Sequence, residues 1–308
     1  MSFAEQFANQ TTVQTTSIEQ LADKTMFLSI EFNRFGNARQ AEVDMTNTTA
    51  QAKRFSHTKK LLDSPELADI QKADNALRIW LDAPTRCWKY GKSIRMVPVE
   101  LVDEIVVTCE NYQNITRPKL VKIFIDAYLS RVAEAQKELG DKFNPADYPS
   151  VEEVEKEFSF TFQFLSFSTP DKLKTISPAL YNKEKAKAAQ MLTVAVDDWK
   201  NGRRVILQEM VNHLLGILKP EEGTKKKLHA KTVEKLQEFL KTFDLDSVKS
   251  LDDPELQAEV AKLKMLMQGV DADKIKESDT LKAQLVENFS AASASLSSLV
   301  TTTGRKFR

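Results

Sequence analysis

Residues 177–218 decide the fold, and they read SPALYNKEKAKAAQMLTVAVDDWKNGRRVILQEMVNHLLGIL. Ser177-Pro178 predicts a helix start, because serine is a preferred N-cap and proline suits the first helical position. We expect one helix to Leu218, about 60 Å long at ~1.5 Å per residue. Its apolar positions approximate a heptad seam that Arg203 interrupts, and Asn201-Gly202 is the expected kink. The seam consists of Leu192, Val196, Trp199, Ile206, Met210, Leu214 and Ile217.

The chain after this helix continues the helical pattern. Three more helices are expected near 231–243, 254–268 and 279–300, with apolar residues stepping by three and four. Asp253-Pro254 and Gly269 supply start and stop signals. Residues 177–300 are therefore predicted to form a long-helix bundle or an antiparallel coiled coil.

The preceding part of the chain predicts a mixed helical domain, residues 25–176, with a small antiparallel β element. Its strands are expected near 26–32 and 158–165. In the second strand phenylalanine occupies every other position, which places all its rings on one face. We expect these two strands to pair, with 93–97 as a further neighbour.

Helices are expected in the same domain between the strands. One runs from Ser64-Pro65 to about Leu81, and another opens near Pro98 and breaks at Arg117-Pro118. A third follows the break and ends at Gly140. The fold class is mainly α, formally α+β, flanked by a flexible N-terminal arm, 1–24, and a basic tail, 301–308.

Charge and composition restrict the classes of function. The 308 residues include 44 basic and 44 acidic side chains, so the formal net charge is zero. Proteins that coat nucleic acid usually carry excess cations, so this balance argues against that role. The start lacks the pattern of a signal peptide, and no apolar run reaches the roughly 20 residues that span a bilayer. With Cys87 and Cys109 as the only cysteines, we expect a cytoplasmic protein without membrane contact.

Motifs for catalysis, cofactors or metals are not found. Gly91-Lys92-Ser93 resembles the end of a phosphate-binding loop, but Arg86 stands where the motif requires glycine. His57, His213 and His229 are far apart in sequence and lack metal-ligand spacing. We therefore expect a protein that is not an enzyme, with no catalytic, cofactor-binding or metal-ligating residues. A hydrolase site assembled across subdomains remains an alternative.

The candidate contact surface is the loop 86–95, RCWKYGKSIR. Cations next to aromatic rings are typical both of interface hot spots and of surfaces that bind single-stranded nucleic acid. Another interpretation is structural, with Trp88 and Tyr90 packed inward and the cations in solvent. The candidate partner-binding residues are Arg86, Trp88, Lys89, Tyr90, Lys92 and Arg95.

Short stretches along the chain resemble one uncharacterised bacterial family, the domain of unknown function numbered three-one-five-zero. The likeness spans roughly residues 25–300, in the same order. The matching segments are NRFGN at 33–37, LLDSPEL at 61–67, FNPADYPS at 143–150, ISPAL at 176–180 and FLKTF at 239–243.

This resemblance implies an accessory role rather than a chemistry. Genes of the family occur in phages and mobile elements, often beside a MoxR-type AAA+ ATPase and a von Willebrand factor A protein. We accordingly expect an interaction or adaptor protein whose partner is one of these proteins or another copy of the chain. The alternative is a nucleic-acid-binding accessory protein that uses the loop 86–95.

Overall fold

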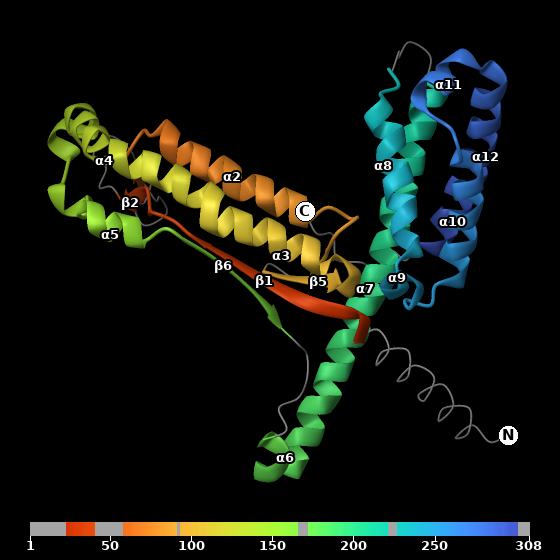
Figure 1. Ribbon diagram of the computed structural model, residues 1–308, viewed down its shortest axis with the longest axis horizontal. Coiled ribbons are helices and arrows are strands. Elements are labelled where there is room, and N and C mark those ends of the chain that lie inside the picture. Colours follow the sequence, from red (N-terminus) through yellow and green to blue (C-terminus); the bar gives the residue numbers. More distant parts are fainter. Residues whose placement is uncertain (1–22, 41–57, 91–92, 166–171, 221–226, 301–308) are drawn as a thin grey trace, which may run out of the picture. The chain divides into compact units, whose positions relative to one another are not determined.

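Figure 1 shows the computed structural model of the protein, which describes residues 23–40, 58–90, 93–165, 172–220 and 227–300. The described part is mainly helical with a small antiparallel sheet of four strands, as the sequence predicts. The strand order is β4-β5-β1-β6. The strands are β1 (Thr25–Asn33), β4 (Trp88–Tyr90), β5 (Ile94–Pro98) and β6 (Ser159–Leu165). The predicted strand positions and the pairing of the first with the last are confirmed.

The chain divides into two compact units. Unit 1 comprises 1–28, 82–102 and 164–308, and unit 2 comprises 29–81 and 103–163. The division differs from the boundary that we predicted between 176 and 177. The difference arises because the β4–β5 hairpin packs on the same core as the C-terminal helices.

Unit 1 is built on α7 (Pro178–Leu218), the longest helix, which starts and ends where the sequence predicts. The side chain of Ser177 accepts a hydrogen bond from the backbone of Leu180 and caps its N-terminus. Helices α8 (Ala230–Lys241) and α12 (Asp279–Leu299) pack against α7. Helices α10 (Pro254–Met267) and α11 (Ala272–Glu277) pack against α8 and α12. Two short helices, α6 (Lys172–Ile176) and α9 (Asp246–Lys249), complete the unit.

Helices α7 and α12 run antiparallel. Arg204 Nη1 donates to the Leu299 carbonyl at 2.7 Å, and Gln208 Nε2 donates to Ser297 Oγ at 2.6 Å. One turn further along α7, Asn212 Oδ1 accepts from Ser293 Oγ at 2.6 Å. Rising numbers on one helix meet falling numbers on the other, which is the pattern of antiparallel neighbours.

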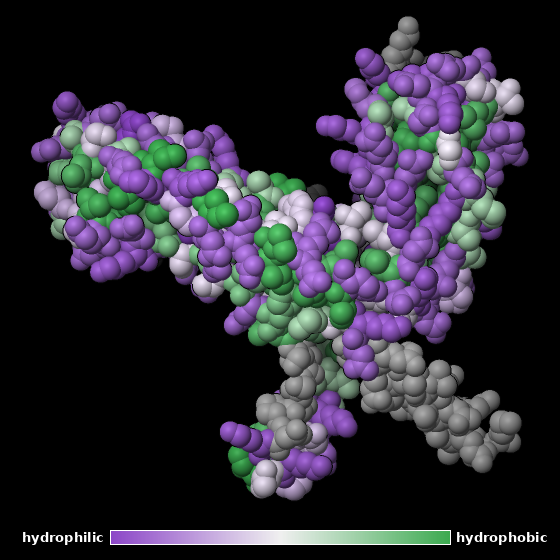
Figure 2. Space-filling view, in the orientation of Figure 1, coloured by the Kyte–Doolittle hydropathy of each residue, from purple (hydrophilic) through white to green (hydrophobic). Residues whose placement is uncertain are grey.

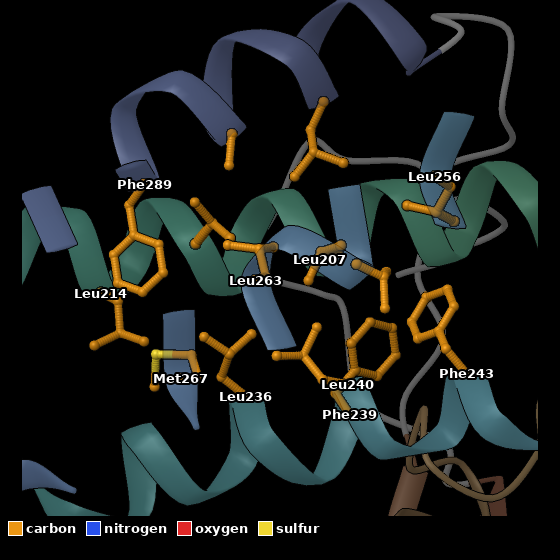
Figure 3. Close-up of a cluster of buried hydrophobic side chains, with 14 of the residues drawn as sticks. Leu207, Leu214, Leu236, Phe239, Leu240, Phe243, Leu256, Leu263, Met267 and Phe289 are labelled. Carbon is orange, nitrogen blue, oxygen red and sulfur yellow. The ribbon is translucent and has the colours of Figure 1, made fainter. Parts of the chain in front are cut away.

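The core of unit 1 consists mainly of apolar side chains from α7, α8, α10 and α12. In Figure 3, Leu207 and Leu214 of α7 lie among side chains of α8 and α10, and Phe289 of α12 lies beside Leu214. Phe27 of β1 and Met96 of β5 belong to the same core. Burial of this apolar surface is the main force that holds the helices together.

The inward face of α7 differs in part from the predicted seam. Ile206 and Met210 are half-buried, whereas Leu207 and Val211 are fully buried. Arg203, predicted to interrupt the seam, lies inside it with 3% exposure. A strict heptad drifts around a straight α-helix, so the buried stripe shifts by one residue along its length. The helix is also continuous through the predicted kink.

Unit 2 contains three longer helices, α2 (Pro65–Leu81), α3 (Val102–Asn111) and α4 (Arg117–Leu139). Two of them, α2 and α4, pack against each other around its apolar core. The short helix α5 (Val151–Lys156) packs against α4 and begins with the predicted capping box of Ser150 and Glu153. A second, two-stranded sheet of β2 (Ala38–Gln40) and β3 (Thr58–Lys60), which we did not predict, joins this unit. The core includes Phe35, Leu62, Ile70, Phe124, Tyr128 and Val154.

The predicted helix break at Arg117-Pro118 is wrong. A π-helical turn, Tyr112–Thr116, joins α3 directly to α4, so the helix continues through this region. A π turn changes the hydrogen-bond spacing locally, and Pro118, which has no N–H to donate, lies in the first turn of α4, where proline is tolerated. The helix ends at Leu139, and Gly140 takes φ +52°, as expected for a C-terminal glycine.

Three predictions lie outside the described residues. They are most of the N-terminal arm 1–24, the tail 301–308 and Lys92.

Candidate partner-binding surface

The loop 86–95 includes β4 and the first two residues of β5, which pair as antiparallel neighbours in unit 1. The register places Trp88 opposite Met96, Lys89 opposite Arg95 and Tyr90 opposite Ile94. Alternation along the strands sends Trp88 and Tyr90 to one face and Lys89 to the other. The two aromatic rings pack against the core of unit 1.

Trp88 lies against the backbone of α7 at Gly202. A Cβ built on Gly202 would stand 1.7 Å from Cη2 of the Trp88 ring, which is far closer than atoms can approach. Glycine at this position therefore permits the indole ring to approach the helix backbone closely. The indole Nε1 is buried and has no hydrogen-bond partner among the described residues. This packing corresponds to the structural interpretation of the loop.

The cations of the loop have different surroundings. Arg95 is 2% exposed, and its Nε donates to Asp82 Oδ1 at 2.7 Å. Lys89 Nζ lies 3.7 Å from Asp82 Oδ2 and is otherwise exposed, and Arg86 is half-buried. Lys92 is not described. Of the six candidate residues, the loop thus offers Lys89 to solvent, while it places Trp88, Tyr90 and Arg95 in packed positions.

A second surface in unit 1 has no counterpart in our sequence-based candidates. We call it the arm: α6 and the first part of α7, residues 172–194. Within these described residues, no side chain before Leu192 is buried, whereas ten side chains of α7 from Leu192 onward are buried. In Figure 1 this end of α7, with α6 packed against it, lies apart from α8, α10 and α12.

Exposed apolar side chains gather on one side of the arm. At about 100° per residue, Leu180, Met191 and Val194 project within about 60° of one another. Each is more than 40% exposed, and Ile176 of α6 is 76% exposed. Figure 2 shows a hydrophobic patch among hydrophilic side chains at the α6 end of the arm. Isolated apolar residues on a surface are normal, but three on one side of a helix form a strip. We call these three residues the apolar strip.

The arm is also basic. It contains five lysines and one acidic residue, Glu184, which accepts from Lys187 Nζ at 2.6 Å. The five lysines, all exposed, are Lys172, Lys174, Lys183, Lys185 and Lys187. Lys174 Nζ lies 6.0 Å from the centre of the Tyr181 ring, a contact between α6 and α7. A signal for this surface was present in the sequence, because KEKAK at 183–187 precedes the first residue of the predicted seam.

Unit 2 contains a buried polar cluster that the sequence did not reveal as such. Asp74 of α2 is fully buried, and its Oδ1 accepts from Tyr112 Oη at 2.6 Å and from Arg117 Nε at 3.0 Å. Arg34 Nε lies 3.7 Å from Oδ2, and Arg117 Nη2 donates to the Asn33 carbonyl at 2.7 Å. Burial, followed by the hydrogen bond to Asp74, raises the pKa of Tyr112.

The contacts of this cluster join separate elements. They connect the end of β1, the middle of α2 and the junction of α3 with α4, so the cluster holds the fold of unit 2 together. Asp74 occupies the centre of an apolar stripe whose other members are Leu67, Ile70, Leu77 and Leu81. A lone aspartate in such a stripe is the sequence signal that could have indicated a buried ion pair.

A groove of about 680 Å³ lies beside this cluster, between α4 and β6. Arg117 and Phe158 are among the residues that line it, and Asp126 and Glu155 supply carboxylates. Lys122 Nζ is bound to Asp126 at 3.1 Å. None of the residues that line the groove is histidine or cysteine. The groove therefore lacks the usual general bases and nucleophiles, apart from carboxylates and Ser159, whose Oγ accepts from Asn33 Nδ2.

Among the described residues, no group of three or more His, Cys, Asp or Glu side chains is arranged to hold a metal ion. No helix in the described ranges has both the length and the apolar character that crossing a bilayer requires. The arm therefore stands out by exposure and charge rather than by any reactive group.

Comparison with known proteins gives no further guide. No protein-family model, curated protein or solved structure matches the chain. The class of this protein is therefore described from its structure: it is mainly helical, with a small antiparallel sheet and a basic, partly apolar arm.

Proposed function

We propose that this chain is a non-enzymatic interaction protein that holds a protein partner on its arm. The observation that carries the proposal is the burial pattern of α7: the second half forms the core of unit 1, and the first half contacts α6 and leaves an apolar strip in solvent. Helix-in-groove recognition uses such a strip, with anchors spaced along one side of a helix.

The arm remains helical without a partner for identifiable reasons. A helix as short as the first part of α7, 178–194, would be only marginally stable in water if it were isolated, because helix nucleation is costly. Here the nucleus already exists, since the same helix continues into the core. The segment is rich in alanine and lysine, which favour helix, and Lys187 pairs with Glu184 one turn earlier. A preformed helix loses less conformational entropy on binding than a disordered segment.

The α7–α12 pair gives the arm a firm base, and we propose that it packs as an antiparallel coiled coil. The resemblance described above suggests the partner: a MoxR-type AAA+ ATPase or a von Willebrand factor A protein, in a phage or mobile element and in the cytoplasm. Nucleic-acid binding through the loop 86–95 is the second function that the sequence suggests. It is less supported, because Trp88 and Tyr90 pack on the core instead of offering their rings to bases.

The test compares two double variants of the full chain. The arm variant is Leu180→Ser/Met191→Ser, and the control is Val99→Ser/Met265→Ser, which changes exposed apolar residues elsewhere in unit 1. Proteins captured by the tagged wild-type chain from its native host are identified by mass spectrometry and purified, and their affinities for all three chains are measured by calorimetry.

We expect the arm variant to bind at least tenfold more weakly, since two anchors each contribute about 1–2 kcal/mol, and the control to bind like the wild type. Equal binding by all three chains, or no captured protein that binds the purified chain, would refute the proposal. If the partner is an AAA+ ATPase, its ATP turnover should change in the presence of the wild-type chain and not of the arm variant.

A further inference from the structure

The arm combines two features that restrict the chemistry of its partner. One is the excess of cations, five lysines against one glutamate over residues 172–194. The other is the apolar strip of Leu180, Met191 and Val194. On the helical projection, Lys183 and Lys187 lie on the same side as this strip and border it. The surface therefore presents apolar anchors beside positive charge.

We propose that the arm recognises an acidic protein surface that carries its own exposed apolar side chains, such as an amphipathic helix with Glu or Asp beside its apolar face. The proposal rests on the function proposed above and names the chemistry of the partner. Positive and negative potentials that match across an interface accelerate encounter and select the partner, while the apolar contact supplies affinity.

Other occupants fit the arm less well. A second arm, from another copy of the chain, would bring five further lysines against these five, and like charges in an interface are unfavourable. Nucleic acid would satisfy the lysines, but its phosphate backbone would leave the apolar strip in water. Helices that lie in a membrane surface usually carry Trp, Phe and Leu on a broad apolar face, whereas this strip is narrow and has a single leucine.

The chain itself provides a matched control for charge. Lys183 and Lys187 are exposed and spaced by four residues on α7, and Lys231 and Lys235 are exposed with the same spacing on α8. Replacing either pair by glutamate changes the net charge of the protein equally. Only the first pair borders the apolar strip.

The experiment measures fluorescence anisotropy of labelled probes with the full chain, Lys183→Glu/Lys187→Glu and Lys231→Glu/Lys235→Glu. The probes are two synthetic helical peptides with identical leucine positions, one flanked by glutamate and one by lysine, and a short single-stranded DNA. Vesicles of phosphatidylserine and phosphatidylcholine are assayed by co-sedimentation.

We expect the acidic peptide to bind the wild type roughly tenfold more tightly than the basic peptide, and to lose roughly tenfold when the arm lysines are reversed. Binding should weaken as NaCl is raised, and the α8 variant should bind like the wild type. Three results would overturn the proposal: no preference for the acidic peptide, equal losses in both variants, or tighter binding of DNA or vesicles than of peptide.

Failure here is distinguishable from failure of the proposed function. If a captured partner depends on Leu180 and Met191 but binds Lys183→Glu/Lys187→Glu as tightly as the wild type, the arm is a binding surface for a partner that is not acidic. The function then stands and the inference about charge is refuted.

Discussion

We predict that Gly202→Ala destabilises the protein, although glycine-to-alanine substitutions inside helices usually stabilise, because the Trp88 ring lies against Gly202. In the interior of an exposed helix, alanine is more stable than glycine by about 1 kcal/mol. At Gly202 the new methyl group would stand 1.7 Å from Cη2 and 2.4 Å from Cζ3 of Trp88, so the ring or the helix must move. Overpacking of this kind costs about 1–3 kcal/mol. We therefore expect unit 1 to lose up to about 2 kcal/mol of unfolding free energy.

The assay is urea denaturation followed by circular dichroism and tryptophan fluorescence, repeated with Trp88→Ala and with both substitutions together. Trp88→Ala alone should destabilise, since it removes a large ring from the core. In that background the methyl group meets no ring, and Gly202→Ala should now stabilise by about 1 kcal/mol. If Gly202→Ala alone raises the free energy of unfolding of the otherwise wild-type chain, the inferred contact between the indole and α7 is refuted.

Three further substitutions test buried or partly buried charges, each by urea denaturation. Asp74→Ala should lower the free energy of unfolding by about 3–5 kcal/mol, because it leaves the guanidinium of Arg117 buried without its carboxylate. A loss below about 1 kcal/mol would contradict the role given to the cluster. Burial, which leaves Arg203 only 3% exposed, lowers the pKa of its guanidinium, so Arg203→Met removes the cost of burying this charge and should raise stability near pH 7 by about 1–4 kcal/mol. A loss of stability in Arg203→Met would contradict this explanation. A hydrogen bond from Arg131 lowers the pKa of Glu66 from 4.5 to about 2, so this carboxylate stabilises the fold above pH 4.5 and loses the effect as pH falls towards 2. Glu66→Gln should reduce that acid-dependent loss, and unchanged acid dependence would show that the pair contributes nothing.

The positions of most elements were predictable, because local signals coincide with tertiary needs. Ser177-Pro178, Asp253-Pro254 and the box at Ser150 begin helices as expected, since each supplies an oxygen to orphaned backbone N–H groups. The alternation of phenylalanines identified β6 because a period of two is specific to strands.

The misses share another physical origin. The π turn before Pro118 depends on how the backbone redistributes its hydrogen bonds, which residue periodicity does not show. Arg203 appeared to be an interruption, but it lies over the rings of Phe239 and Phe243 at 5.0 and 4.3 Å. Those rings come from helices that are distant in sequence, so the contact was not predictable from α7 alone.

The candidate surface was harder to predict than the fold. Trp88 and Tyr90 have the composition of an interface hot spot, yet the same large rings are equally suited to a core. Which role applies depends on whether another element approaches closely, and Gly202 permits that approach. Exposure of the arm is likewise a property of what does not pack against it. The run KEKAK at 183–187 indicates a charged surface, but it does not show which side of the helix stays uncovered.

The two halves of α7 should behave differently in time, although they form one continuous helix. Amides in the second half are released only when the core of unit 1 opens, whereas those in the first half exchange whenever the helix frays from Ser177 inwards. Deuterium uptake should therefore be fast over 178–191 and slow over 207–218. A bound partner would slow exchange in the first segment alone. Binding to the arm could therefore be measured as a local gain of protection, with the exchange rate of the second segment as an internal reference.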